Sequence, residues 1–310
     1  MNRNVACLGE CMIELSEHPD GSISRGFGGD TLNTALYMAR LGMKVQYVTA
    51  LGDDPLSDAM LAAWQGEGIG TQTVIRVPKR LPGLYMIRTD AGGERNFLYW
   101  RDSAPVRQLL SSPDTASVEG ALCRAGLIYL SGITLSLFDA LSRDRLFAIL
   151  QRARRGGTKV AFDTNFRPRG WPDINAARMA FSRAFAHADI VFASVEDHDL
   201  LFGSAEPERI SVRLSDSEVG EFVIKLAQPA CRVIASGEEI MVEAPPVFAV
   251  VDTTAAGDSF AAAYLAARGN GALPEAAALA GHRLAGLVVQ HRGAIIPRAA
   301  MQTLMHGTSA

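Results

Sequence analysis

The sequence has few of the features that mark small secreted, metal-binding or nucleic-acid-binding proteins. Its four cysteines are scattered, with no C-x-x-C pair, so free buried thiols in a reducing compartment are expected. A net charge of -3 gives no reason to expect nucleic acid or a membrane surface as a partner. No apolar run is long enough to span a membrane, and Glu10 interrupts the first one, which argues against a signal peptide. We therefore expect a cytoplasmic protein.

Several nucleotide-binding motifs are also missing. There is no G-x-x-x-x-G-K-[ST] string, which excludes a P-loop protein, and no HRD or DFG signature of protein kinases. The glycines of "GFGGD" (26–30) do not have the G-x-G-x-x-G spacing of a dinucleotide-binding dehydrogenase, and a tight turn explains them equally well. With 48% hydrophobic and 20% charged residues, the 310-residue chain can form a large core.

Short β-rich segments alternate with longer helical ones along most of the chain. This alternation predicts an α/β fold with a mostly parallel central sheet and helices on both faces. Ligands of such sheets bind outside the carboxyl ends of the strands. The expected strands are 4–10, 45–52, 127–132, 159–165, 190–194, 221–225 and 231–236, and clear helical segments are 31–42, 56–68 and 141–157.

One region breaks the alternation. Residues 83–102 contain two β-rich arms around the Gly-rich "DAGGE", which predicts a hairpin. We expect a single domain over 1–310, with segments of about 13–25 and 72–102 forming a small antiparallel lid over the sheet; an ordinary edge hairpin is the alternative. Because side chains alternate along a strand, Trp100 should face away from Tyr99 and Arg101, toward a subunit contact.

The stretch "DTTAAGDSF" (252–260) leads into the helical "FAAAYLAAR" (260–268), so residues 255–258 should lie at a helix N-terminus. The first N–H groups of a helix have no intrahelical partner, and small side chains let an anion approach them. Asp258 fits this place as a helix cap or as a catalytic base, and the residues alone leave both open.

The same nine residues resemble the C-terminal signature of the ribokinase (PfkB) family of carbohydrate kinases. "GGDTLNTALYMARLG" (28–42) resembles that family's other signature. The resemblance implies a ribokinase-like fold and an ATP-dependent transfer to a sugar hydroxyl. It assigns Asp258 as the base, and the N–H groups of Ala255, Ala256 and Gly257 as an anion hole for the transferred group.

Further segments resemble family members that phosphorylate the 6-hydroxyl of 2-keto-3-deoxygluconate, a sugar acid. They include "GECMIELSE", "YLSGITLS", "FDTNFRPRGW" and "RGAIIPR". Arginine forks and tyrosine hydroxyls suit its carboxylate. The resemblance assigns the carboxylate and keto end to Tyr99, Arg101 and Arg167, a ligand contact to Tyr85, and the hydroxyls to Gly29, Asp30 and Asn33. A fructose or ribose kinase and a non-catalytic sugar-acid or nucleotide sensor are the alternatives.

The resemblance also implies ATP and Mg²⁺ as cofactors, with the metal held mostly by phosphate oxygens and water. It places Lys225, Asp197, Gly257 and His282 at the nucleotide. Glu196 is the alternative to Asp197 in "SVEDHD" (194–199). The resemblance also implies a K⁺ site at Asp252 and Thr254, beside residues 292–295. The chain departs from the family at Ala227, where a glycine is usual. An alanine there would crowd any conformation that needs a positive φ. The sequence leaves open a homo-oligomer formed through the lid.

Overall fold

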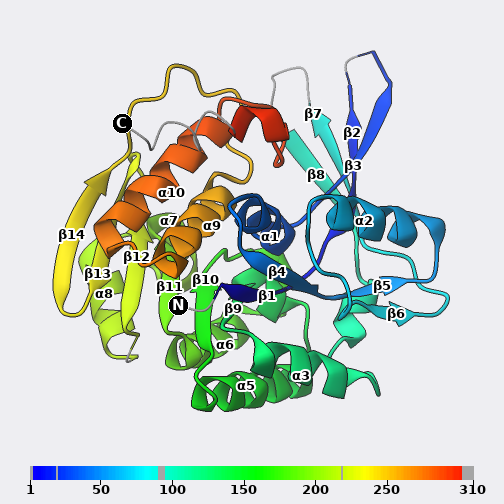
Figure 1. The fold of residues 1–310 in the computed structure, drawn as a ribbon, viewed down its shortest axis with the longest axis horizontal. Helices are drawn as coiled ribbons and strands as arrows, with labels where there is room; N and C mark the ends of the chain where they lie inside the picture. The colour runs from blue at the N-terminus through cyan, green and yellow to red at the C-terminus, as the bar shows by residue number, and fades with distance from the viewer. Residues whose placement is uncertain (1–2, 19, 90–94, 218, 302–310) are drawn as a thin grey trace.

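The computed structural model describes residues 3–18, 20–89, 95–217 and 219–301. Its main element is an eight-stranded sheet with helices on both faces (Figure 1). The strands are β1 Asn4–Leu8, β2 Met12–Glu17, β3 Ile23–Gly28, β4 Lys44–Val48, β5 Ala50–Gly52, β6 Ile75–Val77, β7 Leu84–Thr89, β8 Arg95–Trp100, β9 Leu127–Ser131, β10 Lys159–Asp163, β11 Ile190–Ser194, β12 Glu221–Lys225, β13 Ala230–Ala235 and β14 Glu238–Glu243.

The helices of the described chain alternate with the strands of the large sheet, as the sequence predicts. They are α1 Asp30–Arg40, α2 Pro55–Gly66, α3 Thr115–Arg124, α4 Gly132–Ser136, α5 Ala140–Arg155, α6 Ile174–His187, α7 Val195–Phe202, α8 Pro207–Ser215, α9 Ala256–Gly269 and α10 Pro274–Val288, with short 3-10 turns at Pro105–Gln108 and Pro168–Gly170.

The large sheet has the order β14-β13-β12-β11-β10-β9-β1-β4. The pairs from β4 to β12 are parallel, and β13 and β14 add an antiparallel edge. The prediction of a mostly parallel central sheet is therefore confirmed. Because the parallel strands run the same way, their carboxyl ends meet at one edge, and the helices that follow them begin there.

Alternate side chains of the strands supply two hydrophobic cores, one on each face of the sheet. On β1, Val5 and Cys7 belong to the core under α1, α2, α9 and α10, whereas Ala6 and Leu8 belong to the core under α3, α5 and α6. A period of two in strands buried on both faces explains why these segments read as nearly continuous apolar runs. Figure 1 shows α9 and α10 on one side of the sheet and α5 and α6 on the other.

A second, four-stranded sheet stands beside the large one, in the order β3-β2-β7-β8 (Figure 1). Its outer pairs are antiparallel hairpin pairs, and its middle pair, β2 with β7, is parallel. This small sheet confirms the predicted β flap. The turn of the predicted hairpin at 90–94 lies outside the described residues.

The segment 72–82 was expected in the lid, and this was wrong. Its strand β6 pairs with β5 in a separate two-stranded sheet, after 45–52 has divided into β4 and β5. The lid sheet is therefore built from 12–28 and 84–100.

Side chains alternate across the lid as predicted. Tyr85 and Tyr99 are direct cross-strand partners with ring centroids 6.0 Å apart, so they share one face. Trp100 points to the opposite face and is 59% exposed. Among the described helices, none is both long and apolar enough to cross a membrane.

Candidate functional site

Polar residues that are far apart in the sequence meet at the carboxyl edge of the large sheet. Asp163 ends β10, Ser194 ends β11 and Lys225 ends β12. The N-termini of α1 and α9 reach the same place, because Asn33 of α1 donates a hydrogen bond to Asp258 of α9 over 2.8 Å. This is where a mostly parallel sheet is expected to bind its ligand.

The N-terminus of α9 has no side-chain cap among the described residues. Ala255, at the N-cap position, has a φ of 61°, in the left-handed region that an alanine occupies at a cost of roughly 1–2 kcal/mol. A β-carbon at Gly257 would lie 3.4 Å from the Lys225 ammonium, so the glycine keeps this approach open. An uncapped helix start beside a cation suits an anion.

Asp258 lies in the first turn of α9 and is tied to α1 by two contacts. Its carboxylate accepts from Asn33, and its carbonyl oxygen accepts from the Thr34 hydroxyl at 3.2 Å. Burial raises the pKa of the Asp258 carboxyl to about 7, and the nearby charge of Asp30 adds to the rise. A carboxyl that titrates near neutral pH is suited to general-base chemistry.

Lys225 is the cation at the centre of the site. Its ammonium donates to both carboxylate oxygens of Asp163, at 3.1 and 3.2 Å. Burial alone would lower the pKa of Lys225, but the charges of Asp163 and Asp197 outweigh it and raise the pKa. Burial raises the pKa of Asp163, against the opposing effect of Lys225.

Asp197 lies in the first turn of α7 and is buried, whereas Glu196 beside it is exposed. The Asp197 carboxylate accepts from the Thr164 hydroxyl at 2.8 Å, and its N–H donates to the Ser194 cap at 3.0 Å. Ser194 therefore caps the N-terminus of α7. Of the two acidic candidates, the structure brings only Asp197 within reach of the Lys225 charge.

Asp30 and Gly29 begin α1 next to this cluster. The Asp30 carboxylate accepts from the Ser131 hydroxyl and from the Asn165 amide, the latter at 2.9 Å. A β-carbon at Gly29 would meet the Glu10 carbonyl oxygen at 2.2 Å, so only glycine allows this close passage. Ser131 and Asn165 were missed from the sequence, although each stands at the carboxyl end of a predicted strand.

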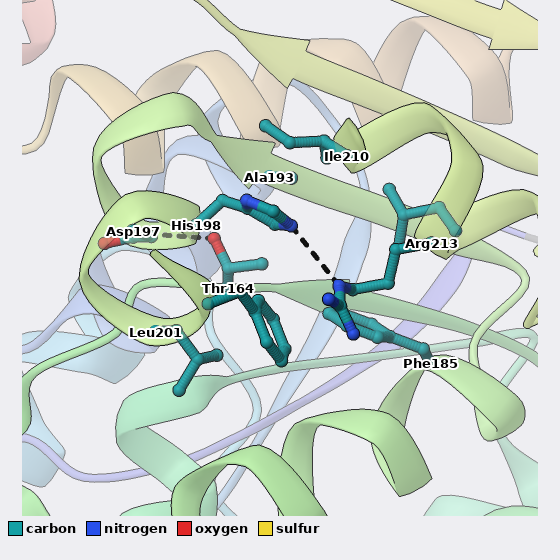
Figure 2. Close-up of a pocket in the computed structure, with 10 residues that line it drawn as sticks. Thr164, Phe185, Ala193, Asp197, His198, Leu201, Ile210 and Arg213 are labelled. Carbon is teal, nitrogen blue, oxygen red and sulfur yellow. Dashed lines mark hydrogen bonds between the residues drawn. The ribbon is translucent and has the colours of Figure 1, made fainter. Parts of the chain in front are cut away.

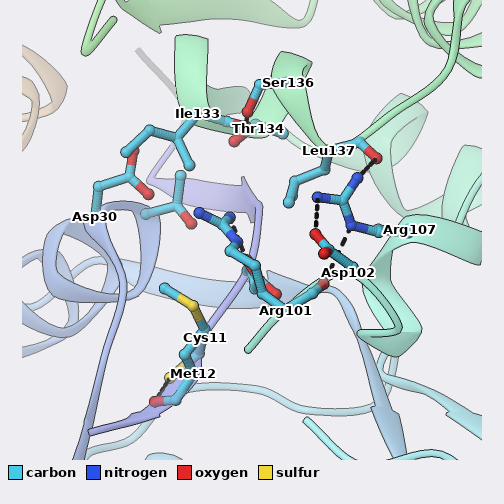
Figure 3. Close-up of polar contacts among 12 residues, drawn as sticks. Cys11, Met12, Asp30, Arg101, Asp102, Arg107, Ile133, Thr134, Ser136 and Leu137 are labelled. Atoms are coloured by element: carbon cyan, nitrogen blue, oxygen red, sulfur yellow. Dashed lines mark hydrogen bonds and ion pairs between the residues drawn. The ribbon is translucent and has the colours of Figure 1, made fainter. Parts of the chain in front are cut away.

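The lid contributes two acid-paired side chains. Tyr85 donates to the Glu14 carboxylate across the β2–β7 pair, and Arg101 forms an ion pair with Glu10. Figure 3 shows Arg101 among polar groups that include Asp30 and Thr134. Neither glutamate was predicted from the sequence as a site residue, and no spacing rule connects Glu10 with Arg101, 91 positions apart.

Tyr99 and Arg167 remain accessible at the rim. Tyr99 is 47% exposed, and the Arg167 side chain is 60% exposed. Arg167 lies 3.5 Å from the Asp197 carboxylate and donates to the Phe166 carbonyl at 2.8 Å. His282 is not brought into the polar cluster: it is buried in α10, bonded to the Val242 carbonyl at 3.1 Å and packed edge-on against Phe260.

Asp252 and Thr254 form a tight loop before α9. One Asp252 oxygen accepts from the Thr254 N–H at 3.0 Å and hydroxyl at 2.6 Å, and the other accepts from the Gly293 N–H at 2.8 Å. The loop thus meets the 292–295 segment through a hydrogen bond. A purely structural role would need the same hydrogen bonds, so the expected K⁺ site stays a prediction. Groups of three or more possible metal-ligating side chains are absent from the described part of the chain.

The unusual residue after Lys225 is accommodated without strain. Ala227 lies in the turn between β12 and β13, where Leu226 donates to the Ala230 carbonyl at 3.1 Å. Among the described non-glycine residues, Ala227 is not one of those with a positive φ. The turn therefore has no need of the glycine that is usual in the family.

Behind Asp197 lies a small enclosed cavity of about 10 Å³, lined in part by Thr164, His198 and Arg213 (Figure 2). Its volume is at the lower limit for one water molecule, so it cannot hold a sugar or a nucleotide. Figure 2 shows the His198–Arg213 and Asp197–Thr164 hydrogen bonds on its walls. The cavity is a packing feature that adjoins the site.

These features define a kinase-like site on an α/β fold, and comparison with known proteins identifies the class. The model of the pfkB family carbohydrate kinases matches residues 2–301, so the chain belongs to this family. The 2-dehydro-3-deoxygluconokinase of Dickeya dadantii (strain 3937) is 47% identical over 307 residues, covering 96% of this chain and 98% of that protein. The protein of the same name from Escherichia coli (strain K12) is 44% identical over 309 residues, covering 97% and 99%.

Solved structures share the fold at lower identity. A fructokinase with bound ATP from Xylella fastidiosa has a TM-score of 0.85 and 23% identity, covering 100% of both chains. A putative ribokinase II in complex with ATP and Mg²⁺ from E. coli has a TM-score of 0.84 and 21% identity, covering 99% of this chain and 100% of that one. The expected ribokinase-like fold and carbohydrate-kinase family are confirmed.

The raised pKa of Asp258 predicts a stability effect. The unfolded carboxyl ionises near pH 4 but the folded one only near pH 7, so wild-type stability falls across this window as pH rises. Asp258→Asn lacks this titration. It should therefore gain stability over wild type between pH 4 and 7, by up to ~1.4 kcal/mol for each pH unit, and the gain should level off above pH 8. Urea unfolding at pH 5 and 8 measures this. Asp58→Asn, which replaces an exposed aspartate, serves as the control. An equal effect of both substitutions on the free energy of unfolding would show that the pKa of Asp258 is not raised.

Proposed function

We propose that this chain transfers the γ-phosphoryl group of ATP to the 6-hydroxyl of 2-keto-3-deoxygluconate. The observation that carries the proposal is the 44–47% identity, over nearly the whole chain, to relatives named 2-dehydro-3-deoxygluconokinase. The site chemistry supports the reaction type, because a carboxyl with a pKa near 7 stands at an uncapped helix start beside a lysine.

In this proposal Asp258 accepts the proton of the attacking hydroxyl, and the transfer is direct, with no covalent intermediate. The N–H groups of Ala255, Ala256 and Gly257 stabilise charge on the transferred group, as an oxyanion hole does. Lys225 balances the phosphate charge from the end of β12. The open approach at Gly257, which a larger side chain would fill, is the observation that fits ATP to this place.

Mg²⁺ would be held mainly by the ATP oxygens and water. Asp197 is the carboxylate that we assign to its water shell, because it is buried and near Lys225. When bound, the metal neutralises charge on the phosphates. Asp252 and Thr254 remain our candidate K⁺ site. His282 remains our candidate for a nucleotide contact, through the packing of α10 against α9.

The sugar acid would lie between the lid and the start of α1. We assign its carboxylate and keto end to Tyr99, Arg101 and Arg167. The charges of the two arginines would have no counterpart on fructose or ribose. We assign the hydroxyls to Gly29, Asp30 and Asn33, with Tyr85 as a further contact from β7. Closure of the lid would exclude the water that competes with the sugar for the phosphoryl group.

The outer lid strand β8 offers a surface for a second copy of the chain. Phe97, Leu98, Tyr99 and Trp100 are 38–59% exposed, which is unusual for four consecutive large apolar side chains. We propose a homo-oligomer formed through this strand. A kinase that uses ATP and a sugar acid would act in the cytoplasm.

The proposed activity is tested by ATP-dependent phosphorylation of 2-keto-3-deoxygluconate, with fructose and ribose alongside. Turnover confined to the sugar acid is expected, because only this substrate brings a carboxylate to the arginines. Turnover of a neutral sugar would preserve the role of Asp258 and overturn the substrate assignment. Measurable binding with no turnover of any sugar would favour a sensor.

Asp258→Asn should lower kcat by roughly 10²–10⁴-fold while leaving both KM values within about twofold, because the general base acts in the chemical step. In wild type, kcat/KM should fall as pH drops below about 7, since the protonated carboxyl cannot accept a proton. Steady-state kinetics from pH 5.5 to 9 measure both effects. Survival of turnover in Asp258→Asn would show that another group is the base.

Arg167→Ala should raise the KM for the sugar acid by roughly 10- to 100-fold, because a hydrogen bond to a charged group contributes about 1.5–3 kcal/mol. The KM for ATP should change far less. Arg169→Ala, which removes an exposed arginine two residues away, is the matched control. Equal losses for both substrates would instead indicate that Arg167 is structural, through its contact with Asp197.

A further inference from the structure

A buried ion pair lies behind the proposed acid-binding end of the site. Glu10 follows β1 and Arg101 follows β8, and their side chains are only 3% and 20% exposed. Burying such a pair costs desolvation energy that its attraction often fails to recover, so stability alone is a weak reason for it. We therefore looked to the function of the site for the role of the Glu10–Arg101 pair.

The backbone is shaped to admit this pair. A β-carbon at Gly83 would meet the Glu10 Oε1 at 2.7 Å and the Arg101 Cβ at 3.2 Å. The Gly83 carbonyl also accepts from the Ile13 N–H at 2.8 Å, which fixes it against the lid strand β2. Any larger residue at this position would crowd the Glu10 carboxylate and the base of the Arg101 side chain.

The pair uses only part of its hydrogen-bonding capacity. Arg101 donates to Glu10 through Nη2 alone. Within the described chain, the buried Arg101 Nε and Glu10 Oε1 have no hydrogen-bond partner. An arginine has five N–H donors in a planar fork, so several remain for a second carboxylate.

A second acid, Asp30, lies close enough for its charge to act on Glu10. The charges that act on Glu10 come from Arg101, Arg107 and Asp30, and burial, the largest effect, raises the pKa of Glu10. Figure 3 shows Arg101 and Asp30 facing the same space. If Glu10 lost its charge, Asp30 would be the acidic group left for Arg101 to meet there.

We propose that Glu10 is a positioning residue that holds the Arg101 guanidinium away from Asp30 and presents its free N–H donors to the substrate carboxylate. The inference rests on the proposed sugar-acid kinase activity. Glu10 thereby also preserves the negative charge of Asp30, which Asp258 senses together with Asp163, Lys225 and the Asn33 amide. Recognition of the acid and activation of the hydroxyl are then linked through one glutamate.

The test is Glu10→Gln, which keeps the shape but removes the charge. The glutamine amide can still accept a hydrogen bond from the guanidinium, but the attraction between opposite charges is lost, so the guanidinium should be held less firmly. We expect the KM for 2-keto-3-deoxygluconate to rise about tenfold, and kcat at pH 8 and the KM for ATP to stay within about twofold. The midpoint of the pH profile should move below the wild-type value, because Arg101 would neutralise Asp30 and ease ionisation of Asp258.

Two further variants test whether the effect is specific to the Glu10–Arg101 pair. Glu17→Gln removes the acid of an exposed pair with Arg88 from the same strand region, and should change none of these quantities. Gly83→Ala keeps both charges but displaces the Glu10 carboxylate, which a β-carbon would meet at 2.7 Å, and should raise the sugar-acid KM. Urea unfolding of each variant checks that it is folded.

The outcomes separate this inference from the proposed function. If wild type phosphorylates the sugar acid and folded Glu10→Gln keeps the wild-type KM and pH profile, the pair is only structural and the inference is wrong. If wild type shows no turnover, calorimetric binding of 2-keto-3-deoxygluconate to wild type and Glu10→Gln still tests it. Weaker binding to the variant would support the inference while the proposed function fails. Equal binding, or none to either protein, would overturn the inference.

Discussion

The structure depends on one electrostatic constraint: several carboxylates are held around a single half-buried lysine, Lys225, at the carboxyl edge of the sheet. Asp163 contacts Lys225 directly, and Asp197 and Asp258 lie within range of its charge. One cation cannot neutralise all of them in a buried place, so some of the cost is expressed as raised pKa values at Asp163 and Asp258. Because its pKa is raised, the Asp258 carboxyl can exchange a proton near neutral pH.

The fold supplies this arrangement through its connectivity. Parallel strands bring Asp163 and Lys225 to one edge although they are 62 positions apart, and helices α1 and α9 add Asn33 and Asp258 at their first turns. Thr34 ties the two helices together through the Asp258 carbonyl. Arg101, which follows the lid strand β8, forms an ion pair with Glu10, which follows β1.

Much of this could be predicted from the sequence, for identifiable reasons. Continuous apolar strand segments between helices fix a parallel sheet, and the small residues before Asp258 fix an open helix start. The pairing of β6 with β5 could not be predicted, because a three-residue strand carries no register information. Glu10, Glu14 and Asn165 were missed since their partners are distant in the chain. His282 was expected near the nucleotide on family position alone, and its described contacts lie within the packing of α10.

The most direct test of this account is the pKa of the Asp258 carboxyl itself, measured by carbon-13 NMR titration of aspartate-labelled protein and assigned by loss of the signal in Asp258→Asn. The account predicts a value near 7 in wild type and a clearly lower one in Asp30→Asn, because burial and the Asp30 charge together raise it. A wild-type value near 4, or one that Asp30→Asn leaves unchanged, would contradict the account.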